Sequence, residues 1–192
     1  NHSWNQPLTT FPSDGLYLIR ELLQPCFFSA SKFKLQRALA IPAEDTWATR
    51  TIEAGYRGSL RCGGPALSQR HLIGLLGLIK LAAGTGPQQP LHIVPRVFAY
   101  DVLGWSQNGH SRNLVEHALD DLRCASVTRR WGNDETPSEV RFIANIERLK
   151  GGVVKITFDH SILNLFRGHD RTYLSLKTMA TLNVGLQTWC YA

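Results

Sequence analysis

The feature that most constrains the fold is the order of segments between Leu67 and Phe158. An apolar stretch with helical spacing comes first, and a short strand, Leu91–Ile93, then leads into a helix that Pro95 begins. A polar Ser-Gln-Asn-Gly-His turn precedes a second helix, whose apolar residues recur every three or four positions. Three runs that alternate apolar and polar side chains follow, and this is the period of half-buried antiparallel strands.

This order predicts an α+β domain of the winged-helix class, in which a β-hairpin wing backs the second helix of a helix-turn-helix. The first helix is apolar on most of its sides, which indicates a central core helix. We expect Phe98, Leu119 and Ile156 to share one hydrophobic interior. The second helix and a β-loop would then point outward side by side, toward a nucleic-acid groove or another protein.

The sequence predicts two parts: an N-terminal arm and helix over residues 1–45, and a winged-helix domain over 46–192 that is one domain of a longer protein. Apolar spacing predicts a helix over Asp14–Leu23 and a long closing helix over Tyr173–Tyr191. Alternation from Val140 to Ile146 predicts one continuous strand.

The net charge of +6 and the pI of about 9.4 make polyanions plausible partners. The charge is unevenly distributed along the chain. Residues 1–96 carry ten Lys and Arg against five acids, a net +5, whereas residues 97–192 carry eleven against ten, a net +1. The helix-turn-helix region is therefore nearly neutral, which argues against a tight DNA binder that acts alone.

Several classes of function have no sequence signal. The four cysteines are scattered without a C-x-x-C pair, which favours reduced thiols in a cytoplasmic protein. His110 and His117 lie seven residues apart without a third ligand nearby, so we expect no metal and no other cofactor. No catalytic motif is present, and we expect no enzyme. Lys80 interrupts the longest apolar stretch, which is too short to span a bilayer, so we expect no membrane partner.

The helix from about Asn108 to Leu122 carries the first set of candidate DNA contacts. Arg112 suits guanine or phosphate, and Asn113 suits adenine. Ser111, together with backbone N–H groups, suits a phosphate, and His117 lies on the same outer face. The alternative is a solvated outer face on an ordinary core helix. Two aspartates at the far end of this helix would repel phosphate.

The predicted wing is the loop Gly132–Ser138, with Arg129, Arg130 and Arg141 at its stem. Arginines at the stem of a polar loop suit contacts that straddle a phosphate backbone. The alternative is surface charge, or ion pairs with Glu139. Upstream, Lys32 and Lys34, together with Arg37, form a second candidate strip of phosphate contacts, and Arg57, together with Arg50 and Arg61, forms another. The alternative for both is ordinary solvated surface.

Six segments carry a resemblance to a known family, and they are matched by layout and hydrophobic pattern. They are the Gly55-Tyr-Arg-Gly58 strand with Leu60, the Leu67–Leu81 helix, His92–Leu103, Ser111–Leu122, Thr157-Phe-Asp-His-Ser-Ile-Leu-Asn-Leu-Phe166, and Leu174–Tyr191. In these segments, over roughly Thr49–Ala192, the chain resembles the TrfA-type iteron-binding initiators of plasmid replication. It departs from them at Val94, where a capping Ser or Thr is more typical, and the stretch Asn1–Asp45 has no clear counterpart.

The resemblance implies the first of two winged-helix domains, the one that supports dimerisation and contacts the DNA backbone. It implies as partners double-stranded DNA at origin repeats, a second copy of the chain, and host replication proteins. Two alternatives remain open. One is a transcriptional repressor or partition accessory factor with the same fold, and the other is a protein–protein dimerisation module that does not contact DNA.

Overall fold

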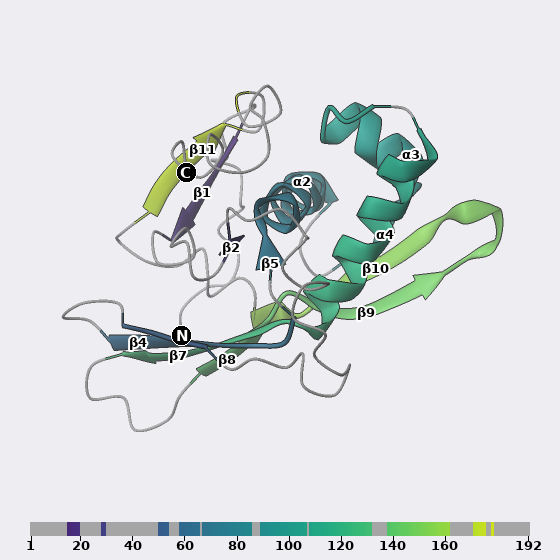
Figure 1. Cartoon of the computed structure of the whole chain (residues 1–192). Helices are drawn as coiled ribbons and strands as arrows, with labels where there is room; N and C mark the ends of the chain where they lie inside the picture. Colours follow the sequence, from purple (N-terminus) through teal and green to yellow (C-terminus); the bar gives the residue numbers. More distant parts are fainter. Residues whose placement is uncertain are drawn as a thin grey trace, which may run out of the picture.

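Helices and strands are mixed in this fold, and helix α2 (Gln69–Thr85) lies at its centre (Figure 1). The computed structural model describes residues 15–19, 28–29, 50–53, 58–65, 67–85, 89–106, 108–131, 138–161, 171–175 and 178.

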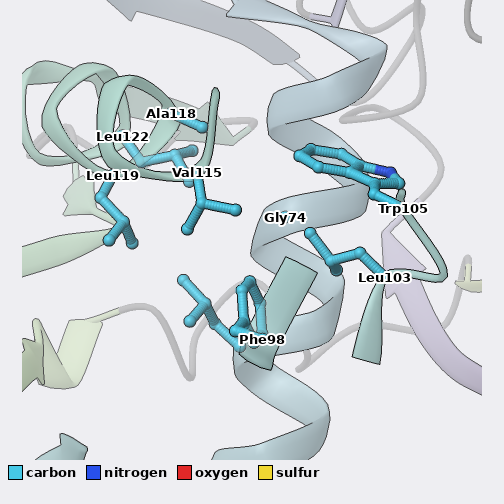
Figure 2. Close-up of a pocket in the computed structure, with 9 residues that line it drawn as sticks. Gly74, Phe98, Leu103, Trp105, Val115, Ala118, Leu119 and Leu122 are labelled. Carbon is cyan, nitrogen blue, oxygen red and sulfur yellow. The ribbon is translucent and has the colours of Figure 1, made fainter. Parts of the chain in front are cut away.

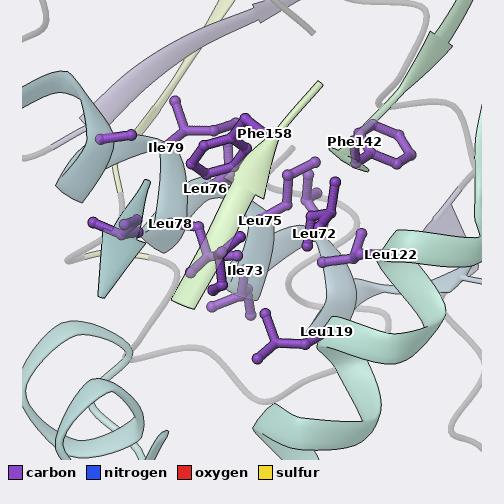
Figure 3. Close-up of a cluster of buried hydrophobic side chains, with 14 of the residues drawn as sticks. Leu72, Ile73, Leu75, Leu76, Leu78, Ile79, Leu119, Leu122, Phe142 and Phe158 are labelled. Carbon is purple, nitrogen blue, oxygen red and sulfur yellow. The ribbon is translucent and has the colours of Figure 1, made fainter. Parts of the chain in front are cut away.

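Helix α2 is central because nearly all of its sides are apolar. Every residue from His71 to Ile79 is buried. Figure 3 shows leucines of α2 facing apolar side chains from other parts of the chain: Leu119, Leu122, Phe142 and Phe158. Each leucine fully removed from water contributes on the order of 1.5–3 kcal/mol to folding. The prediction of a central core helix is confirmed.

A second layer of helices packs against one side of α2. Strand β6 (Leu91–Ile93) leads into α3 (Pro95–Val97), which continues as the π-helical turn η3 (Phe98–Val102). The backbone N–H of Leu103 donates to Phe98 O, and Gly104, at φ 68°, turns the chain out of the helix. Helix α4 (Gly109–Cys124) follows and packs on both α2 and α3.

A three-stranded antiparallel sheet contacts both α2 and α4. Its order is β6-β10-β9, with β9 (Ile143–Arg148) and β10 (Val154–Phe158) forming a hairpin. The turn η4 (Lys150–Gly152) joins them, and its two glycines adopt φ of 78° and 76°, a conformation that residues with a Cβ rarely adopt. Alternate residues of β10 are buried, as their period-two pattern predicts. In Figure 1 the hairpin projects to the right, past the side of α4.

A separate four-stranded sheet has the order β3-β4-β7-β8, with bounds Arg50–Glu53, Gly58–Gly63, Ser126–Trp131 and Ser138–Arg141. The prediction of one strand from Val140 to Ile146 is wrong. The chain bends at the fully buried Phe142, and β8 ends in one sheet before β9 begins in the other. Phe142 and Ile143 are both buried, so the inward face changes at the bend.

Two short strand pairs complete the described fold. Strand β1 (Gly15–Ile19) runs antiparallel to β11 (Arg171–Ser175), and β2 (Phe28–Ser29) runs parallel to β5 (Leu67–Ser68). The predicted helix over Asp14–Leu23 is therefore wrong at 15–19. A short apolar run suits either structure, and here a partner strand more than 150 residues away satisfies its backbone. The closing helix predicted from Tyr173 is a strand as far as Ser175, and its remainder, apart from residue 178, lies outside the described residues.

One hydrophobic cluster joins these layers. It contains Phe98, Leu119 and Ile156 together, so the predicted shared interior is confirmed. Leu174 of β11 also belongs to this cluster. The strand pair that binds residues 15–19 to the distant segment 171–175 therefore packs on the same core as the helices.

Two glycines of α2 provide a matched test of this packing. A Cβ at Gly77 would lie 2.6 Å from Leu103 Cδ2 and 3.1 Å from Phe98 Cζ, whereas a Cβ at Gly74 would meet nothing within 4 Å. We expect Gly74→Ala to raise the free energy of unfolding by about 0.5–1 kcal/mol through helix propensity. Gly77→Ala should lower it by about 1–3 kcal/mol, because both neighbours are buried and must shift. Urea denaturation of both variants measures the difference, and equal shifts would contradict the close helix approach.

Candidate nucleic-acid interface

The N-terminus of α4 is held by a compact polar turn. Asn108, in extended conformation, caps the helix by accepting a hydrogen bond from the backbone N–H of Ser111 at 2.8 Å. The Asn108 amide in turn donates to Ser106 Oγ at 3.0 Å. The Ser106 and Ser111 hydroxyl groups lie 3.4 Å apart. These bonds orient the first turn of α4, which is where the sequence places its phosphate contact.

The two faces of α4 differ sharply. Its buried residues recur at helical spacing and pack toward the core: Ser111, Val115, Ala118, Leu119 and Leu122. Asn113 and His117 are exposed, as expected for the outer face. Arg112 is exposed as well, although its Nε donates to Glu116 Oε1 at 2.8 Å. Ser111 is buried, and its backbone N–H already donates to Asn108, so neither its side chain nor this N–H is free at the helix start.

An ion pair joins the outer face of α4 to the hairpin. Arg148, near the end of β9, donates from Nη2 to both carboxylate oxygens of Asp120, at 2.9 and 2.7 Å. The hydrogen bond and the charge of Asp120 raise the pKa of Arg148 above its ordinary value. An acid that the sequence suggests would repel phosphate is thus neutralised by a neighbouring cation.

The hairpin presents basic side chains on two different sides. Lys150 is exposed at the tip and makes no ion pair within the part of the chain that the structure describes. Lys155 lies on the opposite face of the sheet from buried Val154 and Ile156, and it bonds Glu147 at 3.1 and 3.2 Å. Only the tip lysine therefore adds uncompensated charge beside α4.

The stem residues predicted for the wing belong to the four-stranded sheet, and a different hairpin packs beside α4. Arg129 and Arg130 belong to β7 and pair in register with Leu60 and Ser59 of β4, so they stem from the four-stranded sheet. Their side chains, and residues 132–137 of the predicted loop, lie outside the described part of the chain. The hairpin that packs beside α4 is β9–β10. The sequence signal for it was the Lys150-Gly-Gly152 turn.

The third predicted stem residue, Arg141, is exposed on β8 and lies 3.5 Å from Glu139, as the ion-pair alternative predicts. It also faces Asp159. Burial raises the pKa of the Asp159 carboxyl, but hydrogen bonds from Ser161 and the charges of His160 and Arg141 outweigh it, and the net pKa is lowered. Arg141 thus lies near two acids. Lys32, Lys34 and Arg57 lie outside the described residues.

Sequence reasoning missed a buried histidine that supports α4 from beneath. His71 of α2 is fully buried, and its Nδ1 accepts the backbone N–H of Ser68 at 2.8 Å. The ring proton therefore sits on Nε2, which lies 2.9 Å from Asp121 Oδ2. Ser68 directly precedes α2, and His71 lies three residues after it. In a capping box, a Glu at this position accepts the backbone N–H of the residue that caps the helix, and here the imidazole ring of His71 does so. Asp121 is consequently turned toward α2, away from the outer face.

A small apolar hollow lies between α2, η3 and α4 (Figure 2). Phe98, Leu103 and Trp105 face Val115 and Leu119 across it. This lining is almost entirely apolar and offers no set of polar groups to orient a ligand. We treat the hollow as part of the helix packing.

Two other kinds of site are absent from the described residues. No group of three or more His, Cys, Asp or Glu side chains gathers there in a way that suits a metal ion. No helix among them has the length and apolar character needed to cross a membrane.

No protein-family model matches the sequence, and no curated protein matches it. Among solved structures, the fold is similar to two crystal structures of domains 2 and 3 of RctB. The first has a TM-score of 0.49 and 12% identity over 68% of this chain and 56% of that chain. The second has a TM-score of 0.45 and 12% identity over 62% and 53%. The chain thus spans about half the length of these two structures.

A third similar structure is the WH1 domain of MSBI1.176, a replication protein isolated from a multiple sclerosis patient. Its TM-score is 0.37, with 17% identity over 50% of this chain and 77% of that chain. All three TM-scores are below 0.5, and similarity at this level does not assign a family.

The bond between Asp121 and His71 should support the position of α4. We expect Asp121→Ala to lower the free energy of unfolding by about 1–3 kcal/mol, because it leaves the buried Nε2–H of His71 without this acceptor. Asp121→Asn retains an acceptor oxygen and should cost less. Urea denaturation tests both variants, and an equal loss for the two would show that charge matters more than the hydrogen bond.

Proposed function

We propose that the unit from α2 to β10 is a winged-helix DNA-binding domain, with α4 as its recognition helix and the β9–β10 hairpin as its wing. One observation carries the proposal. A capped helix exposes one polar face, and a hairpin with a lysine at its tip lies directly beside that face. The element order is that of a helix-turn-helix followed by a wing.

The electrostatics of this face support contact with a polyanion. Asp120 is ion-paired with Arg148, and the bond to neutral His71 turns Asp121 away from the outer face, so neither acid stands on that face as a free carboxylate. Lys150 and the positive end of the α4 dipole remain available to phosphate oxygens. Arg112 joins them when phosphate competes with Glu116 for its guanidinium.

We further propose that the parent protein is a replication initiator of the TrfA-type, iteron-binding kind, in which this domain binds double-stranded origin repeats and associates with another copy. The role is non-catalytic. Bound protomers would bend or open origin DNA and recruit host replication proteins. The nearly balanced charge of residues 97–192 suits a domain that shares DNA binding with a second domain or a neighbouring protomer.

The alternative of a protein–protein module is favoured by the same charge balance. A repressor or partition accessory factor would use the same surface of α4, but on a single operator instead of an array of repeats. Comparison of a tandem-repeat probe with a random duplex separates initiator binding from nonspecific binding.

The affinity for duplex DNA should fall steeply with salt, because phosphate contacts release counterions. Arg112→Ala and Lys150→Ala should each weaken binding by about threefold to tenfold and reduce the log–log salt slope by about one. Fluorescence anisotropy across a salt series measures both quantities.

Lys155→Ala is the matched control, because this lysine belongs to the same hairpin but lies on the far face of the sheet. This substitution should leave the DNA affinity and the salt slope almost unchanged. Negligible binding of wild-type protein from low to moderate salt would contradict the proposed function and favour the protein–protein module.

A second prediction concerns the ion pair on the outer face. Asp120→Asn removes a negative charge and releases Arg148, so DNA affinity should rise by about threefold or more with a steeper salt dependence. Arg148→Ala should have the opposite effect, because it leaves Asp120 uncompensated. Glu147→Gln, which removes an acid from the far face, is the control. If Glu147→Gln raised the DNA affinity equally, the gain would come from the net charge of the protein and not from the α4 surface.

A further inference from the structure

The outer surface of α3 and η3 carries an unusual amount of exposed apolar area. In the described part of the chain, four large apolar side chains are well exposed, and three of them lie here: Val94 at 39%, Val97 at 52% and Tyr100 at 50%. The fourth, Leu149, lies apart from them near the hairpin tip. Exposed apolar side chains that gather on one face mark a contact surface more often than single ones do.

The alternation of burial explains this face. Phe98 and Ala99 turn inward and are almost fully buried, so the residues on either side of them face solvent. Arg96 and Val97 precede this buried pair, and Tyr100 and Asp101 follow it. We call these four outward residues the α3 patch.

The α3 patch is self-complementary. Arg96 and Asp101 have opposite charge, and both are exposed without an ion pair among the described side chains. The patch is symmetric in sequence about the midpoint between Phe98 and Ala99. When two copies meet antiparallel across a two-fold axis at this midpoint, Arg96 of each copy faces Asp101 of the other. Val97 of each copy then faces Tyr100 of the other.

We propose that the α3 patch is the contact through which a second copy of this chain associates two-fold symmetrically. Charge complementarity selects this occupant, because one patch supplies both members of each ion pair and both members of each apolar pair. The inference rests on the self-association within the proposed function and assigns a surface to it. It does not depend on DNA contact by α4.

The size of the α3 patch sets the strength of the contact. Four side chains per copy cover far less than the roughly 800 Å² per partner of a standard stable interface. The contact is therefore weak in free solution and becomes effective when a shared DNA brings two copies together. Each exposed ion pair contributes about 0.2–1 kcal/mol, so both the apolar centre and the charges matter.

Sedimentation equilibrium of the full chain without DNA, up to millimolar concentration, tests the proposal. Wild-type protein should show a monomer–dimer equilibrium, and Val97→Asp should raise its dissociation constant by about tenfold or more. Leu149→Asp, a matched change at the other exposed apolar site, should leave it unchanged. A wild-type protein that stays monomeric, or equal effects of the two variants, would overturn the assignment.

A charge exchange identifies the occupant. Arg96→Glu and Asp101→Arg should each weaken association by about threefold to tenfold, because each places like charges opposite one another. An equimolar mixture of the two variants should form a heterodimer of near wild-type affinity, since both ion pairs then form, one between the two native residues and one between the two substituted residues with reversed sign. Failure of the mixture to associate would exclude the two-fold arrangement.

These results are separable from the failure of the proposed function. Val97→Asp should bind a single DNA site as wild-type protein does, because the substitution lies outside the α4 surface. A different outcome is that wild-type protein stays monomeric and Val97→Asp loses single-site DNA binding. This outcome would assign the α3 patch to DNA or to another protein, and would overturn the proposal.

Discussion

The fold depends on the close packing of α2 against the helices that follow it. Gly77 allows Leu103 and Phe98 to approach the backbone of α2, and the leucines around the helix fill the space on its remaining sides. Because α2 is buried on nearly every side, the elements around it are positioned by one shared surface. The direction of α4, and hence of its polar face, follows from this packing.

Polar contacts between elements then determine what α4 presents. His71 draws Asp121 toward α2, and Arg148 holds Asp120 from β9. Arg148 lies 28 residues from Asp120 in the chain, and His71 lies 50 residues from Asp121. In the assembled domain Asp120 is ion-paired and Asp121 is turned away from the outer face, so that face is less acidic than the helix considered alone. This change is central to the proposed contact with DNA.

Sequence patterns predicted local features well where they extended over several turns. The apolar period of α2, the start of α3 at Pro95 and the outer face around Asn113 are all found in the structure. Short segments were harder, because five apolar residues suit a helix or a strand equally. Gly15–Ile19 is a strand only because Arg171–Ser175 pairs with it. The split at Phe142 was hidden for a similar reason, since alternation does not identify the sheet to which a strand belongs.

The sequence alone determined the order of the elements, the apolar centre and the polar side of α4, because periodicity depends on local backbone geometry. Only the tertiary structure decided which hairpin lies beside α4, which acid is ion-paired and which is turned inward, and that Arg96, Val97, Tyr100 and Asp101 share an exposed face. These properties depend on contacts between residues distant in the chain, and their distances are set by how the layers pack around α2.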